Sequence, residues 1–578
     1  MKNRVKSCLI VGRFSSRATN FWPRKSKSAQ QKFPSEVNLT SENYGEHKHA
    51  EPPRRNSGID IEHGIRFGKP QAEHPLPQPR TQVRLPDLRY SETLTEMTSG
   101  KQPADLPQTD LPQASFVKGL GLVSATTLVM GSMIGSGIFI VSADIARQVK
   151  SPGLLILCWL IGAALTLIAA LSYGELAAAM PHAGGQYVYL REAFGRLWGF
   201  LYGWTLFVVI QTGTIAAVAV AFAKYAGVFV PSISAGKYLL GSGNIGLTTQ
   251  QLLAIAVVVL LSIINTRGVR TGALVQNVFT FAKVASLLGL VGLGFLLGRN
   301  PQAIAVNFHD IWRGATFNWA TIALIGSAMV GPLFSSDAWN NVTFTAGEVR
   351  NPKRNLPLSL GLGVGTVSIL YIACNFVYLS VLTLPQIQTA PEDRVATAVV
   401  SVMFGPVATK LMAVAIMIST FGCCNGMIMS GARVYFTMAR DNLFFRRAGE
   451  LDSRHHTPVF ALIIQCVWTC LLTLSGRYND LLDYVILAVL LFYILTIGGL
   501  FRLRRTRPDL ERPYRAWGYP ILPALYMLVA SLIEILLLVN KPTFTVRGLI
   551  LVLLGVPVYF FWRNPAKAPS LANEARPI

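Results

Sequence analysis

The stretch GSMIGSGIFI, residues 131–140, lies inside an uncharged run from Gly119 to Ala143. Such a run can cross a bilayer as a helix, which takes about 20 apolar residues. Glycine disfavours a helix interior by about 1 kcal/mol relative to alanine, yet glycines stand at 131, 135 and 137. The G-x-x-x-G pair Gly131 and Gly135 suits close helix packing in a membrane. Packing does not explain Gly135-Ser136-Gly137, so the stretch predicts a membrane helix that is interrupted at its centre.

The rest of the chain has the composition of a membrane protein. Its 578 residues are 51% hydrophobic and 14% charged, and the mean hydropathy is +0.42. From Gly119 onward, long uncharged runs alternate with short charged connections, whereas the residues before about 115 are polar, proline-rich and without apolar periodicity. We therefore predict a disordered extension over 1–115, a transmembrane transporter domain over 116–565 and a cytoplasmic tail over 566–578. Met97 is an alternative start shortly before the first apolar run.

Hydropathy over windows of about nineteen residues predicts an all-α fold with twelve transmembrane helices. The third and eighth are longer than a bilayer requires, which indicates tilt or protrusion. We expect the spans near 120–147, 153–180, 195–230, 250–266, 271–298, 318–347, 357–384, 405–438, 458–476, 480–503, 519–540 and 545–562.

The formal net charge of +23 does not indicate nucleic-acid binding. No basic patch with interleaved aromatic residues supports such binding, and most of the excess lies beside hydrophobic spans, as expected for a chain whose partner is the lipid bilayer. Arginine and lysine concentrate in the even-numbered connections, so the positive-inside rule predicts that both termini are cytoplasmic. The lack of an organellar signal is compatible with the inner membrane of a bacterial cell. The seven cysteines show neither disulfide nor zinc spacing, and we expect no metal and no cofactor.

A second apolar span is interrupted at a corresponding place. The segment from Gly326 to Asn341 contains a proline, two serines, an aspartate and two asparagines within an otherwise apolar run. Interrupted spans at matching positions of two halves are the sequence sign of a transporter built from inverted repeats. The sequence therefore predicts two five-span halves with broken helices one and six, followed by two extra C-terminal helices.

The physical chemistry of these two breaks predicts what they bind. An unwound segment leaves backbone N–H and C=O groups without helical partners, which costs several kcal/mol for each group in hydrocarbon. The N–H groups from Gly135 to Ile138, at the N-terminus of a half-helix, would hold a carboxylate. The C=O groups from Phe334 to Ser336 would accept hydrogen bonds from an ammonium. Together they fit the zwitterion of an α-amino acid.

Several motifs also resemble a known family, the amino acid–polyamine–organocation (APC) transporters, and within it the L-type amino acid transporter branch. The resemblance covers residues 117–565 and implies twelve spans, a five-plus-five inverted repeat and alternating access. Its motifs are IGSGIF (134–139), YGELAAAMPHAGGQYVYLREAFG (173–195), VQNVFTFAK (275–283), SSDAWNNVTFTAGEVRNPKRNLP (335–357), STFGCCNGMIMSGARVYFTMARDN (419–442), RPDLERPYRAWGYPILP (507–523) and GVPVYFFW (555–562).

The resemblance implies a set of substrate-binding residues, and the chain departs from the family at two places beside them. Phe334 matches the aromatic gate above the substrate. Ser336 stands where the family often has tyrosine, and Ala338 where it usually has glycine. The implied substrate-binding residues are Ile134, Gly135, Ser136, Gly137, Ile138, Phe334, Ser335, Ser336 and Asn340.

Lys283 lies near the middle of the fifth predicted span, where a bare charge costs about 2.5 kcal/mol or more. One interpretation is a lysine that snorkels to the interface or pairs with a neighbour. The resemblance implies instead that its ammonium occupies the cation site of sodium-coupled relatives, in contact with the first break and Ser419. A fixed ammonium would remove the need for sodium, and its titration would permit proton coupling.

Other polar residues in the spans are candidates with two interpretations each. Glu175 is an internal gate or a packing residue, and Trp339 is a further gating candidate. Asp337 caps the half-helix that follows it, which we favour, or faces the pocket and selects cationic substrates. Gln211 and Thr212 line the pocket or form hydrogen bonds between helices.

The sequence thus predicts a sodium-independent transporter of L-amino acids, and we expect exchange of neutral ones. The alternative is a proton-coupled carrier, or one for cationic amino acids or polyamines. The chain has neither an HExxH nor a GxSxG motif, which argues against an enzyme. Eukaryotic L-type transporters attach to a heavy chain through a cysteine between spans three and four. Residues 231–250 contain no cysteine, so we expect no disulfide-linked partner.

Overall fold

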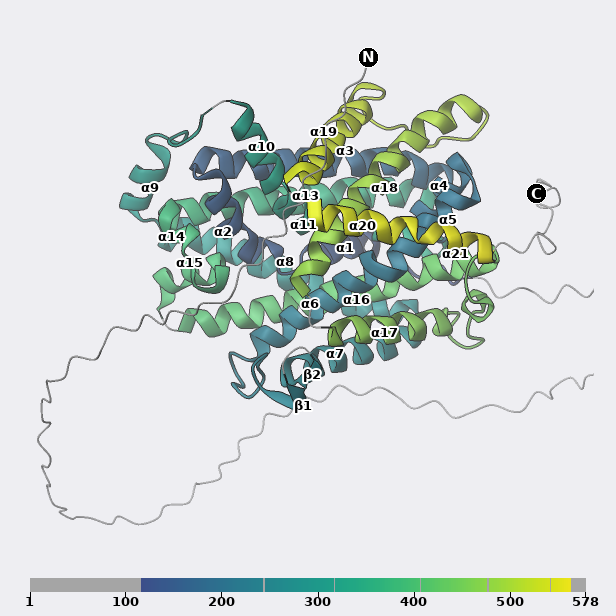
Figure 1. The fold of residues 1–578 in the computed structure, drawn as a ribbon, viewed down its shortest axis with the longest axis horizontal. Helices are drawn as coiled ribbons and strands as arrows, with labels where there is room; N and C mark the ends of the chain where they lie inside the picture. Colours follow the sequence, from purple (N-terminus) through teal and green to yellow (C-terminus); the bar gives the residue numbers. More distant parts are fainter. Residues whose placement is uncertain are drawn as a thin grey trace, which may run out of the picture. The chain divides into compact units, whose positions relative to one another are not determined.

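The computed structural model describes residues 116–242, 245–316, 318–405, 407–475, 478–540 and 542–562. The predicted extension 1–115 and the predicted tail 566–578 lie outside the described residues. The described part is a bundle of helices with one small strand pair (Figure 1).

The first predicted span is broken, as the glycines of GSMIGSGIFI indicate. Helix α1 runs over Leu122–Met133 and α2 over Gly137–Val149, with a bend of 40° between them. Helix α1 packs against α13, α8 and α16, so the break lies inside the bundle (Figure 1).

Within the described residues, eight continuous helices are long and apolar enough to cross a membrane, and the bent pair makes nine. The third span keeps its direction through a five-residue π-helical segment, Leu206–Ile210. The eight are α3 Pro152–Ala179, α5–α6 Arg196–Ala226, α7 Thr249–Thr266, α8 Val269–Leu297, α13 Pro352–Val381, α16 Val407–Arg440, α18 Tyr478–Thr506 and α19 Ile521–Asn540.

The sixth, ninth and twelfth predicted spans contain shorter helices. The sixth is divided because the chain leaves the helix at Ser336 and resumes at Asn341, which gives the second break. The segments are α10 Trp319–Ala328, α11 Val330–Ser335 and α12 Asn341–Phe344 in the sixth, α17 Val459–Leu474 in the ninth, and α20 Pro542–Leu553 with α21 Gly555–Trp562 in the twelfth.

The connections hold elements that the hydropathy pattern does not predict. The fold is helical as predicted, with one small hairpin between α6 and α7, where β1 Tyr238–Ser242 pairs antiparallel with β2 Ile245–Thr248. Gly241 gives this segment a left-handed backbone position, with φ at 72°, which favours a tight turn over a helix. The short helices are α4 Gln186–Phe194, α9 Pro301–Phe308, α14 Leu384–Gln388 and α15 Val395–Phe404, with 3₁₀ turns at Ala346–Glu348, Pro391–Asp393 and Arg446–Gly449.

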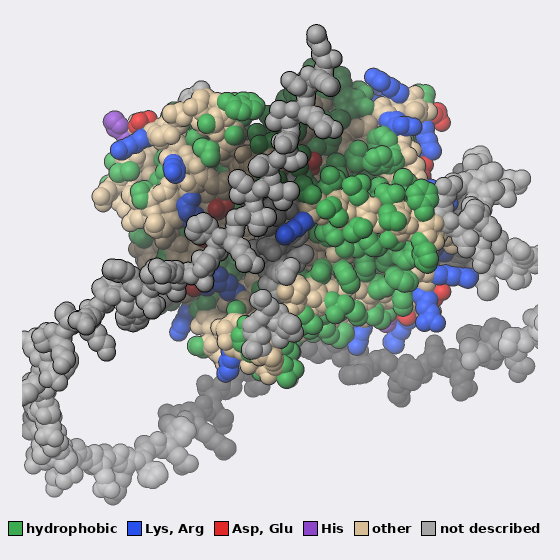
Figure 2. Space-filling model, in the orientation of Figure 1, with side chains coloured by type: hydrophobic (Ala, Val, Ile, Leu, Met, Phe, Trp, Pro, Cys, Tyr) green, Lys and Arg blue, Asp and Glu red, His purple; other side chains and the backbone are tan. Residues whose placement is uncertain are grey.

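Large apolar side chains face outward on several spans. Ile369 on α13 is 69% exposed and Leu274 on α8 is 63% exposed. Figure 2 shows hydrophobic side chains gathered over one broad face, with many basic side chains toward its edges. Soluble proteins rarely expose so wide an apolar patch, so this surface belongs to a multi-pass membrane protein.

Candidate functional site

Side chains from two other helices donate hydrogen bonds to the backbone carbonyl groups of the first break. Lys283 Nζ, on α8, lies 2.8 Å from Gly131 O and 2.7 Å from Ile134 O, and also 2.8 Å from Ser419 O on α16. Ser419 Oγ donates to Ile134 O at 3.1 Å or Gly135 O at 2.8 Å. The structure thus brings Lys283 and Ser419 together at the break, and Lys283 is fully buried and does not snorkel.

The backbone N–H groups of the same break, unlike its carbonyl groups, have no hydrogen-bond partner among the described residues. Those of Gly135, Ser136, Gly137 and Ile138 donate no hydrogen bond to any described residue. All four residues are buried, and a buried N–H without an acceptor costs free energy comparable to a lost hydrogen bond. The break thus presents a cluster of free N–H donors at the N-terminus of α2. Its carbonyl oxygens already accept hydrogen bonds from Lys283 and Ser419. Such a cluster of donors suits an anionic group.

The second break lies directly against the first. A Cβ atom on Gly137 would overlap the side chain of Ser335 at the end of α11. Tyr371 of α13 joins the two breaks, because its hydroxyl lies 3.2 Å from Met133 O and 3.1 Å from Ser335 O. Ala338 has a left-handed backbone with φ at 63°, which explains a preference for glycine at this place.

Two of the three carbonyl groups predicted to accept from an ammonium already have partners, whereas Ser336 O accepts no hydrogen bond from any described residue. Phe334 O accepts from Asp337 N at 3.2 Å, and Ser335 O accepts from Tyr371. A carbonyl oxygen has two lone pairs, so Ser335 O retains one free acceptor position, whereas Phe334 O also accepts from Ser336 N. Phe334 itself is half-buried.

Two small cavities, each of about 20 Å³, flank Asp337. Asn340 and Gln211 line the first, and Ser336 and Trp339 line the second. A volume of this size holds a water molecule and nothing larger. Residues 134–138 line neither of these two cavities.

Asp337 faces these cavities. Its Oδ1 accepts a hydrogen bond from Tyr493 OH of α18 at 2.6 Å. Helix α12 has Asn340 at its N-cap and no side-chain cap. The prediction that Asp337 caps this half-helix is therefore wrong. Asn340 Nδ2 donates to Gln186 Oε1 at 2.8 Å, which joins the second break to α4.

Trp339 belongs to a buried aromatic cluster. Its ring lies 4.8 Å from Tyr173 and 5.1 Å from Tyr493 between ring centroids, and Trp339 is 1% exposed. Edge-on and tilted contacts at these distances are favourable. The cluster holds α3, α18 and the second break together.

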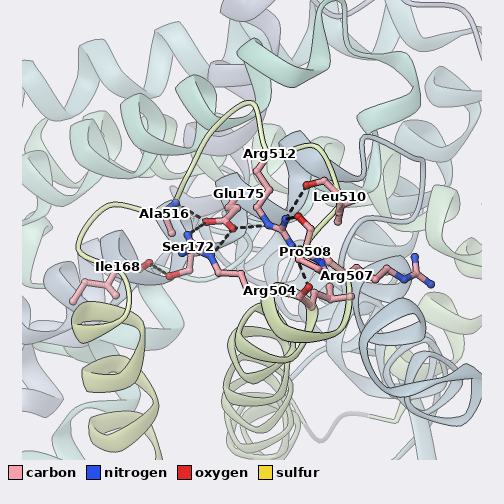
Figure 3. Close-up of polar contacts among 10 residues, drawn as sticks. Ile168, Ser172, Glu175, Arg504, Arg507, Pro508, Leu510, Arg512 and Ala516 are labelled. Atoms are coloured by element: carbon pink, nitrogen blue, oxygen red, sulfur yellow. Dashed lines mark hydrogen bonds and ion pairs between the residues drawn. The ribbon is translucent and has the colours of Figure 1, made fainter.

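Glu175 is held by the end of α18 and the connection that follows it (Figure 3). Arg504 donates to both carboxylate oxygens, at 2.9 and 2.6 Å, and Ala516 N donates to Oε2 at 2.7 Å. Arg512 Nε lies 3.4 Å from Oε1. Glu175 is 1% exposed, and a buried carboxylate needs such partners. Its contacts tie α3 to this connection and include no residue of either break.

Gln211 fits both of its interpretations, whereas the hydroxyl of Thr212 bonds within its own span and not to another helix. Gln211 Nε2 donates to Met427 O of α16 at 2.8 Å, and the residue also lines a cavity. Thr212 Oγ1 donates to Phe207 O of its own span at 2.6 Å, across the π-helical segment. Within the described chain no group of three His, Cys, Asp or Glu side chains is placed to hold a metal ion.

Sequence reasoning missed three residues of this region. Tyr371 and Tyr493 lie in apolar runs that contain other tyrosines as well, and nothing local distinguishes them from packing residues. Gln186 could have been found from the motif AGGQYVY. There a polar glutamine directly follows two glycines and precedes an apolar span.

The chain matches known proteins over nearly all of this structure. The family model described as amino acid permease matches residues 120–560. The b(0,+)-type amino acid transporter 1 of Mus musculus is 30% identical over 476 residues, 80% of this chain and 92% of the relative. The Asc-type amino acid transporter 1 of Homo sapiens is 29% identical over 475 residues, with 80% and 86% covered. The large neutral amino acids transporter small subunit 2 of Oryctolagus cuniculus is 29% identical over 479 residues, with 79% and 84% covered. The chain therefore belongs to the amino acid permease family of membrane transporters and is not an enzyme.

Proposed function

We propose that this permease is a sodium-independent exchanger of neutral L-amino acids, of the L-type branch. Its transporter domain spans residues 116–565 with twelve transmembrane helices. They form a five-plus-five inverted repeat and two further helices, in the cell membrane with both termini cytoplasmic. Nine candidate spans among the described residues, and shorter apolar helices at the three remaining predicted positions, support this count.

The observation that carries the proposal is the asymmetry of the first break. Its carbonyl groups are satisfied by Lys283 and Ser419, while the N–H groups from Gly135 to Ile138 have no acceptor among the described residues. An amino acid carboxylate would complete these donors. In the proposed complex its ammonium uses the free acceptor positions of Ser335 O and Ser336 O, which belong to the adjoining break.

The ammonium of Lys283 supports sodium independence. Three carbonyl oxygens around one point are ligands that suit a hard cation such as sodium. The Nζ atom contacts all three carbonyl oxygens at 2.7 to 2.8 Å. A covalently held cation at this point leaves no place for a mobile one.

The preference for neutral substrates rests on two supports. The residues proposed to hold the substrate, 134–138 and 334–336, are all uncharged and offer only backbone dipoles to the zwitterion. The relatives include a protein named as a transporter of large neutral amino acids. Ser336 in place of a family tyrosine would leave more room beside the substrate.

A second candidate is a proton-coupled carrier, or one for cationic amino acids or polyamines, and one observation favours it. The Asp337 carboxylate faces two cavities beside the second break and is fixed by Tyr493. A cationic side chain extending from the breaks would find its counter-ion there.

Reconstitution of the purified full chain in liposomes tests these proposals together. Vesicles preloaded with leucine, lysine or putrescine are assayed for uptake of the same labelled compounds, in sodium or choline, at two pH values. The leading proposal expects uptake of labelled leucine stimulated by internal leucine, unaffected by sodium and by a pH gradient. Uptake that requires a pH gradient, or stimulation by lysine or putrescine alone, would favour the second candidate. Sodium dependence would refute both.

We also propose that no partner is linked to this chain by a disulfide. One relative is named as a small subunit, so a partner is a reasonable expectation for that protein. The segment between the third and fourth spans has no cysteine here, and all six described cysteines are free. A band of higher mass on a non-reducing gel of the native membrane, lost on reduction, would overturn this proposal.

A further inference from the structure

A cavity of about 680 Å³ lies away from both breaks, between α3, α13 and the connection of α18 to α19. It is far larger than the two cavities beside Asp337. Leu171 of α3 and Pro357 with Gly361 of α13 form its floor, and Pro513 and Tyr514 of the connection form one wall. The wall packs tightly against α3, because a Cβ on Gly174 would lie 3.0 Å from Tyr514 and 3.4 Å from Pro357.

The lining of this cavity is basic at one end and apolar at the other. Lys353 and Arg354 line it at the start of α13, and Leu358 and Leu362 line it further along. Residues 354, 358 and 362 are spaced by four, so they form one stripe on the helix. No Asp or Glu is among its lining residues. This stripe passes from the charged Arg354 to the exposed leucines 358 and 362 within about 12 Å. Such a change from charged to apolar side chains is expected where lipid headgroups meet the hydrocarbon.

Two further features place the cavity at this boundary. Leu358 is 39% and Leu362 is 53% exposed, on a helix that is a candidate span. Trp517, in the same connection as Tyr514, is 73% exposed. Exposed tryptophans concentrate where the headgroups lie.

We propose that this groove binds an anionic phospholipid of the surrounding membrane. Its phosphate pairs with Lys353 and Arg354, and an acyl chain lies along Leu358 and Leu362. Basic pockets between membrane helices recognise anionic headgroups in this way. A free phosphate could use the two charges alone, but it would leave the apolar part of the groove unfilled.

One acidic group competes with the headgroup. Glu511 Oε2 lies 2.5 Å from Lys353 Nζ, and the two side chains are 71% and 53% exposed. Exposed ion pairs of this kind contribute little, about 0–1 kcal/mol, so a phosphate can displace the carboxylate. Glu511 therefore weakens lipid binding without preventing it.

The groove shares a wall with the residues that hold Glu175. Pro513 and Tyr514 lie between Arg512 and Ala516, both of which contact the Glu175 carboxylate (Figure 3). A lipid in the groove would hold this connection against α3 and α13. The bound lipid would thereby stabilise the ion-pair cluster of Glu175.

Native mass spectrometry of the purified full chain with dioleoyl phosphatidylglycerol tests the proposal, with dioleoyl phosphatidylcholine and inorganic phosphate as separate arms. We expect saturable phosphatidylglycerol binding that raises the melting temperature and exceeds phosphatidylcholine binding at least tenfold. Inorganic phosphate should compete only weakly. Equal binding of the two lipids, or full competition by phosphate, would overturn the proposal.

Four variants locate the site. The double variant K353Q/R354Q should bind phosphatidylglycerol about thirtyfold more weakly, from the loss of two basic residues near an anionic headgroup. The control R446Q/R447Q removes two exposed arginines elsewhere and should change binding less than twofold. Glu511→Gln should strengthen binding severalfold, and Gly361→Leu should block the groove, since a Cβ there meets only Leu171, at 3.7 Å. Wild-type binding by K353Q/R354Q and Gly361→Leu, both folded by their melting curves, would refute the site. None of these measurements depends on transport.

Discussion

Replacing Lys283 tests the part of the site that the structure defines best. The substitution Lys283→Met keeps the apolar stem of the side chain and removes its ammonium. In the wild type this group donates to Gly131 O, Ile134 O and Ser419 O at 2.8, 2.7 and 2.8 Å. The variant therefore removes one buried charge and three hydrogen bonds without opening a large cavity.

The expected loss of stability is small. Hydrogen bonds to a charged group contribute about 1.5–3 kcal/mol each, but burying the ammonium costs several kcal/mol in return. Ile134 O keeps Ser419 Oγ as a donor, and Ser419 O lies within the continuous helix α16. Only Gly131 O is left without a donor among the described residues, since Gly135 N does not donate to it, at a cost of about 1–3 kcal/mol. We expect a lower melting temperature by less than about 10 °C.

The expected loss of transport is larger. Lys283 fixes the carbonyl side of the first break, and release of even one charged hydrogen bond there, about 1.5 kcal/mol, corresponds to at least about tenfold in transport. The assay is exchange of labelled leucine in liposomes that contain equal amounts of folded protein. Lys410→Met, which alters an exposed lysine of α16, is the matched control and should transport normally.

Sodium distinguishes the cation-site interpretation from a general structural role. Lys283→Ala leaves three carbonyl oxygens around the point that the ammonium occupies in the wild type, and these are oxygen ligands for a hard cation. We expect this variant to recover part of its transport in sodium and none in choline. Full transport by both Lys283 variants without sodium would refute the reasoning, and equal failure in both salts would leave Lys283 a structural residue and reject the cation-site interpretation.

Three further substitutions test neighbouring parts of the structure. Ala338→Gly should raise the melting temperature, because glycine removes about 1 kcal/mol of left-handed strain; an unchanged value would contradict that strain. Tyr371→Phe should raise KM severalfold at nearly constant melting temperature, since its hydroxyl bridges both breaks; wild-type KM would argue against this bridge. Glu175→Gln should destabilise the folded state by about 3 kcal/mol, because Arg504 loses its charged partner, and Arg504→Gln should do the same. Denaturation by either variant at the wild-type midpoint would show that the pair is dispensable.

The sequence predicts the spans of this fold well where an apolar run is long and uninterrupted. It is less informative in the connections, where short segments form regular structure. Val395–Phe404 is apolar but has only ten residues, so it forms a short helix in a connection. The hairpin between α6 and α7 follows from local glycine conformation and strand pairing, which hydropathy windows do not detect. The position of each break was predictable, because small and polar residues interrupt an otherwise apolar run at both places.

The partners of the first break were less predictable, because they come from helices far along the chain. The three glycines of GSMIGSGIFI show the difference. A Cβ on Gly131 would overlap Gln276 and Thr280 of α8, as the packing interpretation expects, whereas a Cβ on Gly135 would meet only Cys423, at an ordinary 3.4 Å. A Cβ on Gly137 would overlap Ser335 of the second break. Within the interruption Gly135-Ser136-Gly137, the requirement for glycine therefore falls on residue 137, where the two breaks touch, and less on residue 135. If the amino acid backbone binds between the breaks, Gly137→Ala should separate them and impair transport more than Gly135→Ala, a ranking that exchange measurements on the two variants would decide.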